Sequence, residues 1–219
     1  MTMPTDYSAV RNTMVEQQVR PWEVLDPRVL EAVSAVPREL FVPDAYKTLA
    51  YADLPLPLAH GETMMKPVVE GRLLQALELQ AQDEVLEIGT GSGYLTACLA
   101  RMAREVVSID LLEAFTGAAR TRLDALGVGN VRLETADALA YEPGRKFDAV
   151  AVTGAVATIP AAFGQWLKPG GRLFVVHGAS PAQSAVRGTW RGGQLHLEGL
   201  FETDIPYLRG AEPVPRFTL

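Results

Sequence analysis

Three glycines at alternate positions, Gly89, Gly91 and Gly93, follow an apolar run that ends in the carboxylate of Glu87. Glycine permits positive φ angles, and its lack of a side chain lets a ligand approach the backbone closely. A second short apolar run ends in Asp110, about 20 residues after the first glycine, which is the spacing at which a carboxylate meets the hydroxyls of a ribose. Together these features indicate a site for an adenosine-containing cofactor. The alternative is a glycine-rich turn that binds nothing.

The spacing of the glycines distinguishes between cofactors. A dinucleotide-binding turn has the pattern G-x-G-x-x-G, whereas here Tyr94 occupies the position of the third glycine and so disfavours a nicotinamide oxidoreductase. A P-loop is excluded, because no lysine followed by serine or threonine completes the turn. The pattern Glu-x-Gly-x-Gly-x-Gly is similar to the first motif of the Rossmann-like, class I methyltransferases. This similarity implies S-adenosyl-L-methionine as the cofactor.

Polar residues also follow two other apolar runs. Asp137 and Ala138 come directly after the run at 131–135, and a carboxylate there can accept a hydrogen bond from an adenine amine. The alternative role for Asp137 is that of a helix N-cap. Residues 153–155, Thr-Gly-Ala, follow the run at 147–152. Because ligands bind at the carboxyl ends of parallel strands, we expect these residues to lie near the glycine turn.

Alternating apolar runs and helical periodicities predict an α/β fold with a doubly wound, mostly parallel sheet. The expected strands are at 84–88, 106–110, 131–135, 147–152 and 172–177. The expected helices between them are at 94–103, 112–126 and 159–167. Two further runs, 186–191 and 195–201, flank Gly192-Gly193 and predict a hairpin, so the sheet ends in antiparallel strands. Residues 81–219 therefore form the expected cofactor-binding core.

Residues 1–80 are expected to form an N-terminal helical cap that belongs to the same compact unit. Residues 1–6 lack periodicity and are expected to form a loose arm. Helices are predicted at 7–19, after the N-cap signal Asp26-Pro27, and at 67–79. The proline-rich stretch at 37–67 has no regular pattern, and so long an irregular stretch is typical of a lid or a functional loop.

The composition limits the classes of partner. The 219 residues carry a formal net charge of −6 and include no stripe of Lys and Arg, so we expect no binding to nucleic acid. No apolar run reaches the ~20 residues that a membrane span needs. The single cysteine cannot form an internal disulfide, which fits the reducing cytoplasm, and no Cys/His cluster has metal-ligand spacing. We expect a soluble, cytoplasmic monomer without a metal.

The chain resembles the protein-L-isoaspartate (D-aspartate) O-methyltransferase family over roughly residues 14–178. The motifs that carry this resemblance lie at 14–18, 36–43, 50–57, 85–94 and 167–173. The resemblance implies that the segment at 59–70 closes over the methyl group and the substrate. It also implies a set of cofactor contacts, namely Met64, Glu87, Gly89, Thr90, Gly91, Ser92, Asp110, Leu111, Asp137 and Ala138.

The segment before the third expected helix departs from the family pattern. That pattern is Gly-Gln-Thr-Ile-Ser followed by one residue and Pro, whereas this chain has Gly-Glu-Thr-Met-Met-Lys-Pro at 61–67. Met65 therefore stands where the family has its active-site serine. Thr63 and Met65 are the candidate catalytic positions, and Lys66 and Thr153 are candidates for positioning the acceptor.

The implied reaction transfers a methyl group to a carboxylate oxygen of a peptide or protein and gives a methyl ester. A carboxylate is ionised at neutral pH, so no general base is required. This is consistent with the lack of a recognisable catalytic triad. Two alternatives stay open: a methyltransferase of the same fold with a different small-molecule or peptide acceptor, and a protein that binds the cofactor without catalysis.

Overall fold

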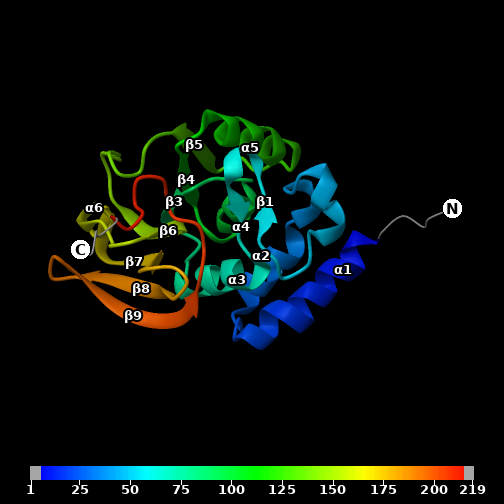
Figure 1. Cartoon of the computed structure of the whole chain (residues 1–219), viewed down its shortest axis with the longest axis horizontal. Coiled ribbons are helices and arrows are strands. Elements are labelled where there is room, and N and C mark those ends of the chain that lie inside the picture. The colour runs from blue at the N-terminus through cyan, green and yellow to red at the C-terminus, as the bar shows by residue number, and fades with distance from the viewer. Residues whose placement is uncertain (1–5, 215–219) are drawn as a thin grey trace, which may run out of the picture.

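The computed structural model describes residues 6–214, so the expected arm at 1–6 lies outside the described residues except for Asp6. A seven-stranded sheet with the order β5-β4-β3-β6-β7-β8-β9 forms the centre of the molecule (Figure 1). The first five strands in this order are parallel, and β8 and β9 are antiparallel, which confirms the predicted fold class. The strands are β3 (Glu84–Ile88), β4 (Glu105–Asp110), β5 (Val131–Thr135), β6 (Phe147–Val156), β7 (Leu167–His177), β8 (Gln183–Arg191) and β9 (Gln194–Thr203).

The central strands are buried on both faces of the sheet, with alternate residues pointing to opposite sides. Val85 and Val106 belong to a hydrophobic cluster that includes helix α4 (Tyr94–Met102). Leu86 and Val107 belong to a second cluster on the other face, which includes Phe163 of the short helix α6 (Ala161–Gln165). The remaining helix of this half is α5 (Glu113–Ala125).

The N-terminal helices pack together, and the last of them lies beside the β8–β9 hairpin (Figure 1), where its Arg72 guanidinium carbon is 5.0 Å from the centre of the Phe201 ring. They are α1 (Tyr7–Met14), continued by a π-helical turn (Val15–Val19) and a 3₁₀ helix (Arg20–Trp22), then α2 (Pro27–Ala35) and α3 (Pro67–Ala76). Asp26 caps α2 as predicted, since its side chain accepts the N–H of Arg28 at 2.9 Å. Met14, Leu73 and Val85 share one hydrophobic cluster, so the cap and the sheet pack around a common core.

The proline-rich segment at 37–67 contains more local structure than its pattern predicts. Its pieces are 3₁₀ helices at Arg38–Leu40, Asp44–Leu49 and Ala59–Gly61 and a two-stranded ribbon of β1 (Leu56–Pro57) and β2 (Thr63–Met64). The elements stay short because proline has no N–H to extend a helix or a ladder. The ribbon places Thr63 and Met64 opposite β1, next to the sheet's carboxyl edge.

The predicted bounds of three elements in the C-terminal half were wrong. Helix α6 covers only five residues, and β7 begins at Leu167 instead of 172. Strand β6 continues to Val156, so residues 153–155 lie inside the strand and do not follow it. The cause is a distant partner: the Ala155 N–H donates to the Pro206 carbonyl, and the Leu208 N–H donates to the Ala155 carbonyl, both at 2.8 Å.

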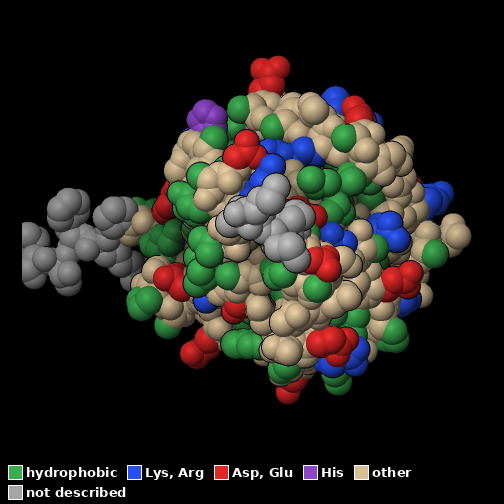
Figure 2. Space-filling model, turned by 90° about the vertical axis from the view of Figure 1, so that its right-hand side faces the viewer, with side chains coloured by type: hydrophobic (Ala, Val, Ile, Leu, Met, Phe, Trp, Pro, Cys, Tyr) green, Lys and Arg blue, Asp and Glu red, His purple; other side chains and the backbone are tan. Residues whose placement is uncertain are grey.

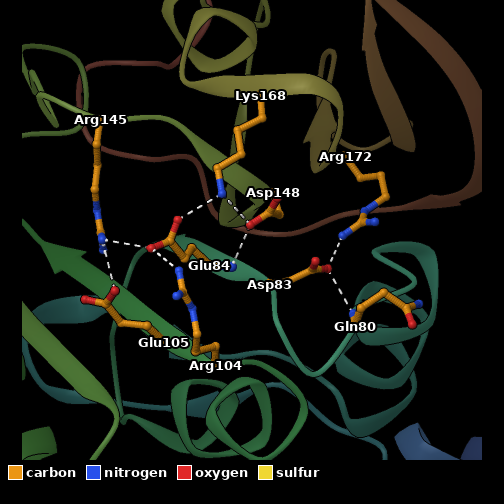
Figure 3. A network of polar contacts seen from close by, with 9 residues as sticks. All are labelled: Gln80, Asp83, Glu84, Arg104, Glu105, Arg145, Asp148, Lys168 and Arg172. Atoms are coloured by element: carbon orange, nitrogen blue, oxygen red, sulfur yellow. Dashed lines mark hydrogen bonds and ion pairs between the residues drawn. The ribbon is translucent and has the colours of Figure 1, made fainter.

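Ion pairs cross the amino-terminal ends of the parallel strands. Glu84, the first residue of β3, contacts Arg104, Arg145 and Lys168, which come from three different parts of the chain (Figure 3). Lys168 also contacts Asp148 at 2.8 Å. This network lies at the end of the sheet opposite to the glycine turn. It therefore links the strands at a distance from the cavity described below.

The face that carries α1 shows acidic, basic and hydrophobic side chains interspersed (Figure 2). The basic side chains on that face do not gather into one patch. None of the helices between residues 6 and 214 has the length and hydrophobicity that a membrane crossing requires.

Candidate active site

A cavity of ≈ 140 Å³ opens at the carboxyl ends of β3, β4 and β6. This is the point where the strand order reverses, because β4 and β6 lie on either side of β3. Its walls come from the loop before α3, the glycine turn with the segment after β4, the residues after β5, and the segment after β9. The lining residues used below are Glu62, Thr63, Met65, Lys66, Gly89, Gly91, Asp110, Leu111, Asp137, Ala138, Thr153 and Arg209.

The glycines of the turn are required for different reasons. Gly89, Gly91 and Gly93 all have positive φ angles, of 94°, 50° and 86°. A Cβ on Gly89 would lie 2.2 Å from Thr153 Oγ1, so a larger residue there would collide with β6. A Cβ on Gly91 would meet only a Leu58 methyl group, at 3.6 Å. The Gly91 backbone therefore borders the cavity, where a bound molecule can approach it.

Asp110 ends β4 and presents a carboxylate whose two oxygens are already oriented. Oδ2 accepts the Gly91 N–H at 2.9 Å, and Oδ1 accepts the Leu112 N–H at 3.0 Å. Burial raises the pKa of Asp110, and these two backbone hydrogen bonds oppose the rise. Each ionised oxygen can accept a further hydrogen bond. The Asp110 carboxylate can thus accept hydrogen bonds from two neighbouring hydroxyls, which is the arrangement that a ribose offers.

Asp137 and Ala138 also line the cavity. The Asp137 side chain accepts the Leu139 N–H at 2.9 Å, and a turn, not a helix, follows it. The alternative of a helix N-cap is therefore wrong. Leu111 lies beside Asp110 with 45% of its surface exposed, so it offers an apolar wall to an adenosine-sized group.

Glu87 and Thr90 do not line the cavity in this structure, although both were expected as cofactor contacts. Strand alternation directs the fully buried Glu87 towards α4, and its Oε2 accepts from Thr96 and from Ser108 at 2.5 Å each. Thr90 Oγ1 lies 2.6 Å from Ser108 Oγ. Burial raises the pKa of Glu87 to about 8, against the two hydroxyl donors. These hydrogen bonds link the end of β3 and the start of the glycine turn to β4 and α4.

Ser92 and Met64 likewise lie away from the cavity wall. The Ser92 hydroxyl accepts the Tyr94 N–H at 3.3 Å, at the start of α4. Met64 is 4% exposed and packs in the hydrophobic cluster, because alternation along β2 turns it to the side opposite Thr63.

Thr63, Met65 and Lys66 lie together along one wall of the cavity. Met65 is 8% exposed, and its thioether offers no strong donor or acceptor. Lys66 forms no ion pair with the residues that the structure describes. Thr153 lies across the cavity with its Oγ1 2.9 Å from the Ile88 carbonyl and 2.8 Å from that of Gly89, and it can donate to either.

The segment after β9 was missed by the sequence analysis. Arg209 lines the cavity and donates to Glu62 Oε1 at 2.8 Å and to the His60 carbonyl at 2.9 Å. The segment thus closes the cavity against the loop before α3. Residues 204–211 have neither strand nor helix periodicity, so no local sequence pattern predicts that this segment lines the cavity.

Within residues 6–214, no group of three or more His, Cys, Asp or Glu side chains is arranged to hold a metal ion. The fold and the site are those of a class I, S-adenosylmethionine-dependent methyltransferase: a doubly wound sheet carries a glycine turn and an acidic second strand at its switch point, and Tyr94 replaces the third glycine of a dinucleotide-binding turn.

Comparisons with known proteins give the family. The family model for protein-L-isoaspartate(D-aspartate) O-methyltransferase matches residues 9–201. A protein-L-isoaspartate O-methyltransferase of Methylorubrum extorquens is 42% identical over 215 residues, covering 95% of this chain and 94% of its own length. Protein-L-isoaspartate O-methyltransferase 1 of Rhodopseudomonas palustris is 41% identical over 84% of this chain and 74% of its own. The chain belongs to the protein-L-isoaspartate(D-aspartate) O-methyltransferase family.

Solved structures show the same fold. A protein-L-isoaspartate O-methyltransferase superposes with a TM-score of 0.81 at 25% identity, covering 92% of this chain and 66% of its own. A Plasmodium falciparum protein described by the same name, in complex with S-adenosyl-L-homocysteine, superposes with a TM-score of 0.80 at 18% identity over 94% of this chain and 99% of its own.

Proposed function

We propose that this chain methylates the free carboxylate of an isoaspartyl residue in a peptide or protein, and so takes part in protein repair. The observation that carries the proposal is one cavity that joins Asp110 and Gly91 on one side to Thr63, Met65 and Lys66 on the other. The family supports the acceptor class. We also propose that the protein acts as a monomer and that it acts in the cytoplasm.

The cofactor is assigned to the wall made by β3, β4 and the segment after β5. Asp110 accepts from the ribose hydroxyls, Gly91 allows the close approach of the bound molecule, and Asp137 accepts from the adenine amine. Leu111 and Ala138 supply apolar contacts. When bound, S-adenosylmethionine supplies a methyl group whose bond to sulfur breaks as a bond to the acceptor oxygen forms.

The chain's contribution to the reaction is orientation and the exclusion of water. The acceptor carboxylate is ionised at neutral pH, so no side chain has to remove a proton. Lys66 pairs with the acceptor, and the Thr63 hydroxyl donates to it, so that one oxygen faces the methyl group. The Arg209–Glu62 ion pair closes the cavity mouth and limits entry of water.

A different acceptor is the second candidate, and Met65 favours it. In place of a hydroxyl, the wall presents an apolar thioether, which cannot satisfy polar groups of an isoaspartyl chain. This candidate keeps the cofactor assignment and changes only the substrate.

The test is methyl transfer to an isoaspartyl peptide, with a peptide of the same sequence containing ordinary aspartate as the control. The measurements are incorporated methyl label and release of S-adenosylhomocysteine. Transfer to the isoaspartyl peptide alone supports the proposal. Transfer only to other molecules of a cell extract would support the second candidate, and cofactor binding without any transfer would indicate a binding module.

A further inference from the structure

A fully buried guanidinium lies behind the acceptor wall of the cavity. Arg38, in the 3₁₀ helix Arg38–Leu40, has no exposed surface. Its Nη2 donates to the Met65 carbonyl at 2.6 Å, and its Nη1 forms an ion pair with Glu70. Its guanidinium carbon also lies 4.6 Å from the centre of the Tyr94 ring.

These contacts join three parts of the chain that meet at the site. Met65 comes directly after the ribbon pairing that ends at Met64, and its carbonyl accepts from Arg38. Glu70 lies in the first turn of α3 and is 3% exposed. Tyr94 begins α4, immediately after the glycine turn. The guanidinium therefore fixes the acceptor wall relative to the cofactor turn.

Stability alone is a weak reason for a buried ion pair, because the loss of hydration often exceeds the attraction between the charges. Well-packed apolar side chains would commonly serve the core as well. They would not donate to the Met65 carbonyl. The pair is thus suited to orienting one backbone segment.

We propose that Arg38, held by Glu70, is a positioning residue that sets the backbone of Met65 and thereby the orientation of the acceptor in the cavity. The proposal rests on the proposed function for its catalytic consequence. Its structural part, the control of Met65 by a charged pair, stands independently of any acceptor.

The protonation of Glu70 gives this arrangement a pH dependence. Burial raises the pKa of Glu70 to about 7, and the charge of Arg38 opposes the rise. The other ionisable groups facing it are Asp53, Tyr94, Cys98 and Glu87. Above pH 7 Glu70 is ionised and forms the ion pair with Arg38. Below pH 7 Glu70 becomes protonated, and its attraction to the Arg38 guanidinium weakens. The acceptor carboxylate stays ionised through this range.

Three variants test the proposal: Glu70→Gln, Arg38→Lys, and the double variant Arg38→Met/Glu70→Leu, which keeps an apolar core. The matched control is Glu39→Gln. Glu39 lies in the same 3₁₀ helix and is 9% exposed, but its partners Arg11 and Tyr51 are not cavity residues.

The first readout needs no acceptor. In protein labelled with ¹³C-methyl methionine, the Met65 resonance, assigned with Met65→Leu, is expected to shift in all three variants and to stay in place in Glu39→Gln. An unchanged Met65 resonance in folded Glu70→Gln and Arg38→Lys would overturn the proposal, whatever the wild type methylates.

The second readout is kinetic. With an isoaspartyl peptide, kcat/KM is expected to fall about tenfold in Glu70→Gln, while affinity for S-adenosylhomocysteine changes by less than about twofold. The wild-type decrease in kcat/KM below pH 7 should be absent in Glu70→Gln and retained in Glu39→Gln. An active wild type with equally active variants contradicts the positioning role; an inactive wild type contradicts only the proposed function.

Discussion

Asp110 is the side chain on which cofactor affinity is expected to depend most. Its two oxygens are oriented by backbone N–H groups and face the cavity. The variant Asp110→Ala removes charge-assisted hydrogen bonds worth about 1.5–3 kcal/mol, which corresponds to a loss of affinity of at least about tenfold. Calorimetric titration with S-adenosylmethionine measures this loss.

The control for that variant is Asp124→Ala, which removes an exposed carboxylate on α5. It should bind the cofactor like the wild type. Wild-type affinity in a folded Asp110→Ala protein would contradict the assignment of Asp110 to the cofactor site. It would also contradict the assigned position of the ribose.

Met65 is expected to limit turnover on isoaspartyl acceptors. An isoaspartyl chain brings polar groups into the closed cavity, and each group left without a partner costs about 1–3 kcal/mol. Wild-type turnover should therefore be low, and Met65→Ser should raise it by roughly one order of magnitude, because the hydroxyl both donates and accepts. Steady-state kinetics with one isoaspartyl peptide compare the two proteins.

The matched control for Met65 is Met65→Leu, which keeps the apolar volume and should not gain activity. If the wild type already matches a family member that carries the serine, another hydroxyl supplies the contact, with Thr63 the nearest candidate on the same wall. In that case the departure at Met65 has no catalytic effect.

At the scale of single residues, spacing alone predicted where Gly91 and Asp110 lie, because both belong to one consecutive strand–turn–helix–strand unit, from β3 to β4. It could not predict that Glu87 faces α4, since that depends on which face of the sheet each strand residue occupies. Nor could it predict Arg209, whose contacts with Glu62 and His60 span almost 150 positions of the chain.

Among the elements, the loop before α3 and the segment after β9 meet at the mouth of the cavity. They are joined by the Arg209–Glu62 ion pair, whose side chains are 46% and 30% exposed. An exposed pair of this kind is worth no more than about 1 kcal/mol, so it can open to admit a peptide-sized acceptor.

Hydrogen exchange is expected to report this closure. Exchange across residues 55–67 should slow when S-adenosylhomocysteine is added, because the filled cavity gives the loop a surface to close on. Exchange in β3 should not change. Protection of 55–67 that already equals that of β3 without ligand would exclude the lid.

The central strands and the helices α3, α4 and α5 could be predicted because each has a continuous apolar pattern of its own. The parts that could not be predicted depend on distant partners. Strand β6 extends to Val156 because the chain returns to it at 206–208. The short 3₁₀ helices in 37–67 form where prolines interrupt longer elements, and no periodicity marks them.

The whole molecule has ionisable groups with opposite effects on stability at its two ends. At the amino ends of the strands, Lys168 hydrogen bonding lowers the pKa of Glu84 (Figure 3). Near the site, burial raises the pKa of Glu70 to about 7 and that of Glu87 to about 8. Folding thus favours the ionised form of Glu84 and the neutral form of the other two.

The free energy of unfolding is therefore expected to be greatest near pH 4.5, the ordinary pKa that all three groups have in the unfolded chain. The stability that Glu84 supplies is present above its ordinary pKa of 4.5 and is lost as the pH falls through its lower folded value. Glu70 and Glu87 act in the opposite sense. Between their ordinary pKa of 4.5 and their folded values of about 7 and 8, rising pH lowers stability, because ionisation is harder in the folded chain.

Urea unfolding from about pH 3 to 9 tests both branches, provided that the dependence of the free energy on urea concentration stays the same. Glu87→Gln keeps an oxygen that can accept from Thr96 and Ser108 but cannot ionise, so it should flatten the decrease between about pH 4.5 and 8. Glu84→Gln should flatten only the decrease below pH 4.5. Two results would show that Glu87 is ionised in the folded chain: a wild-type midpoint that rises steadily from pH 6 to 9, or a Glu87→Gln midpoint with the same pH dependence as the wild type. Either result would contradict the assignment of a neutral Glu87 carboxyl beneath the glycine turn.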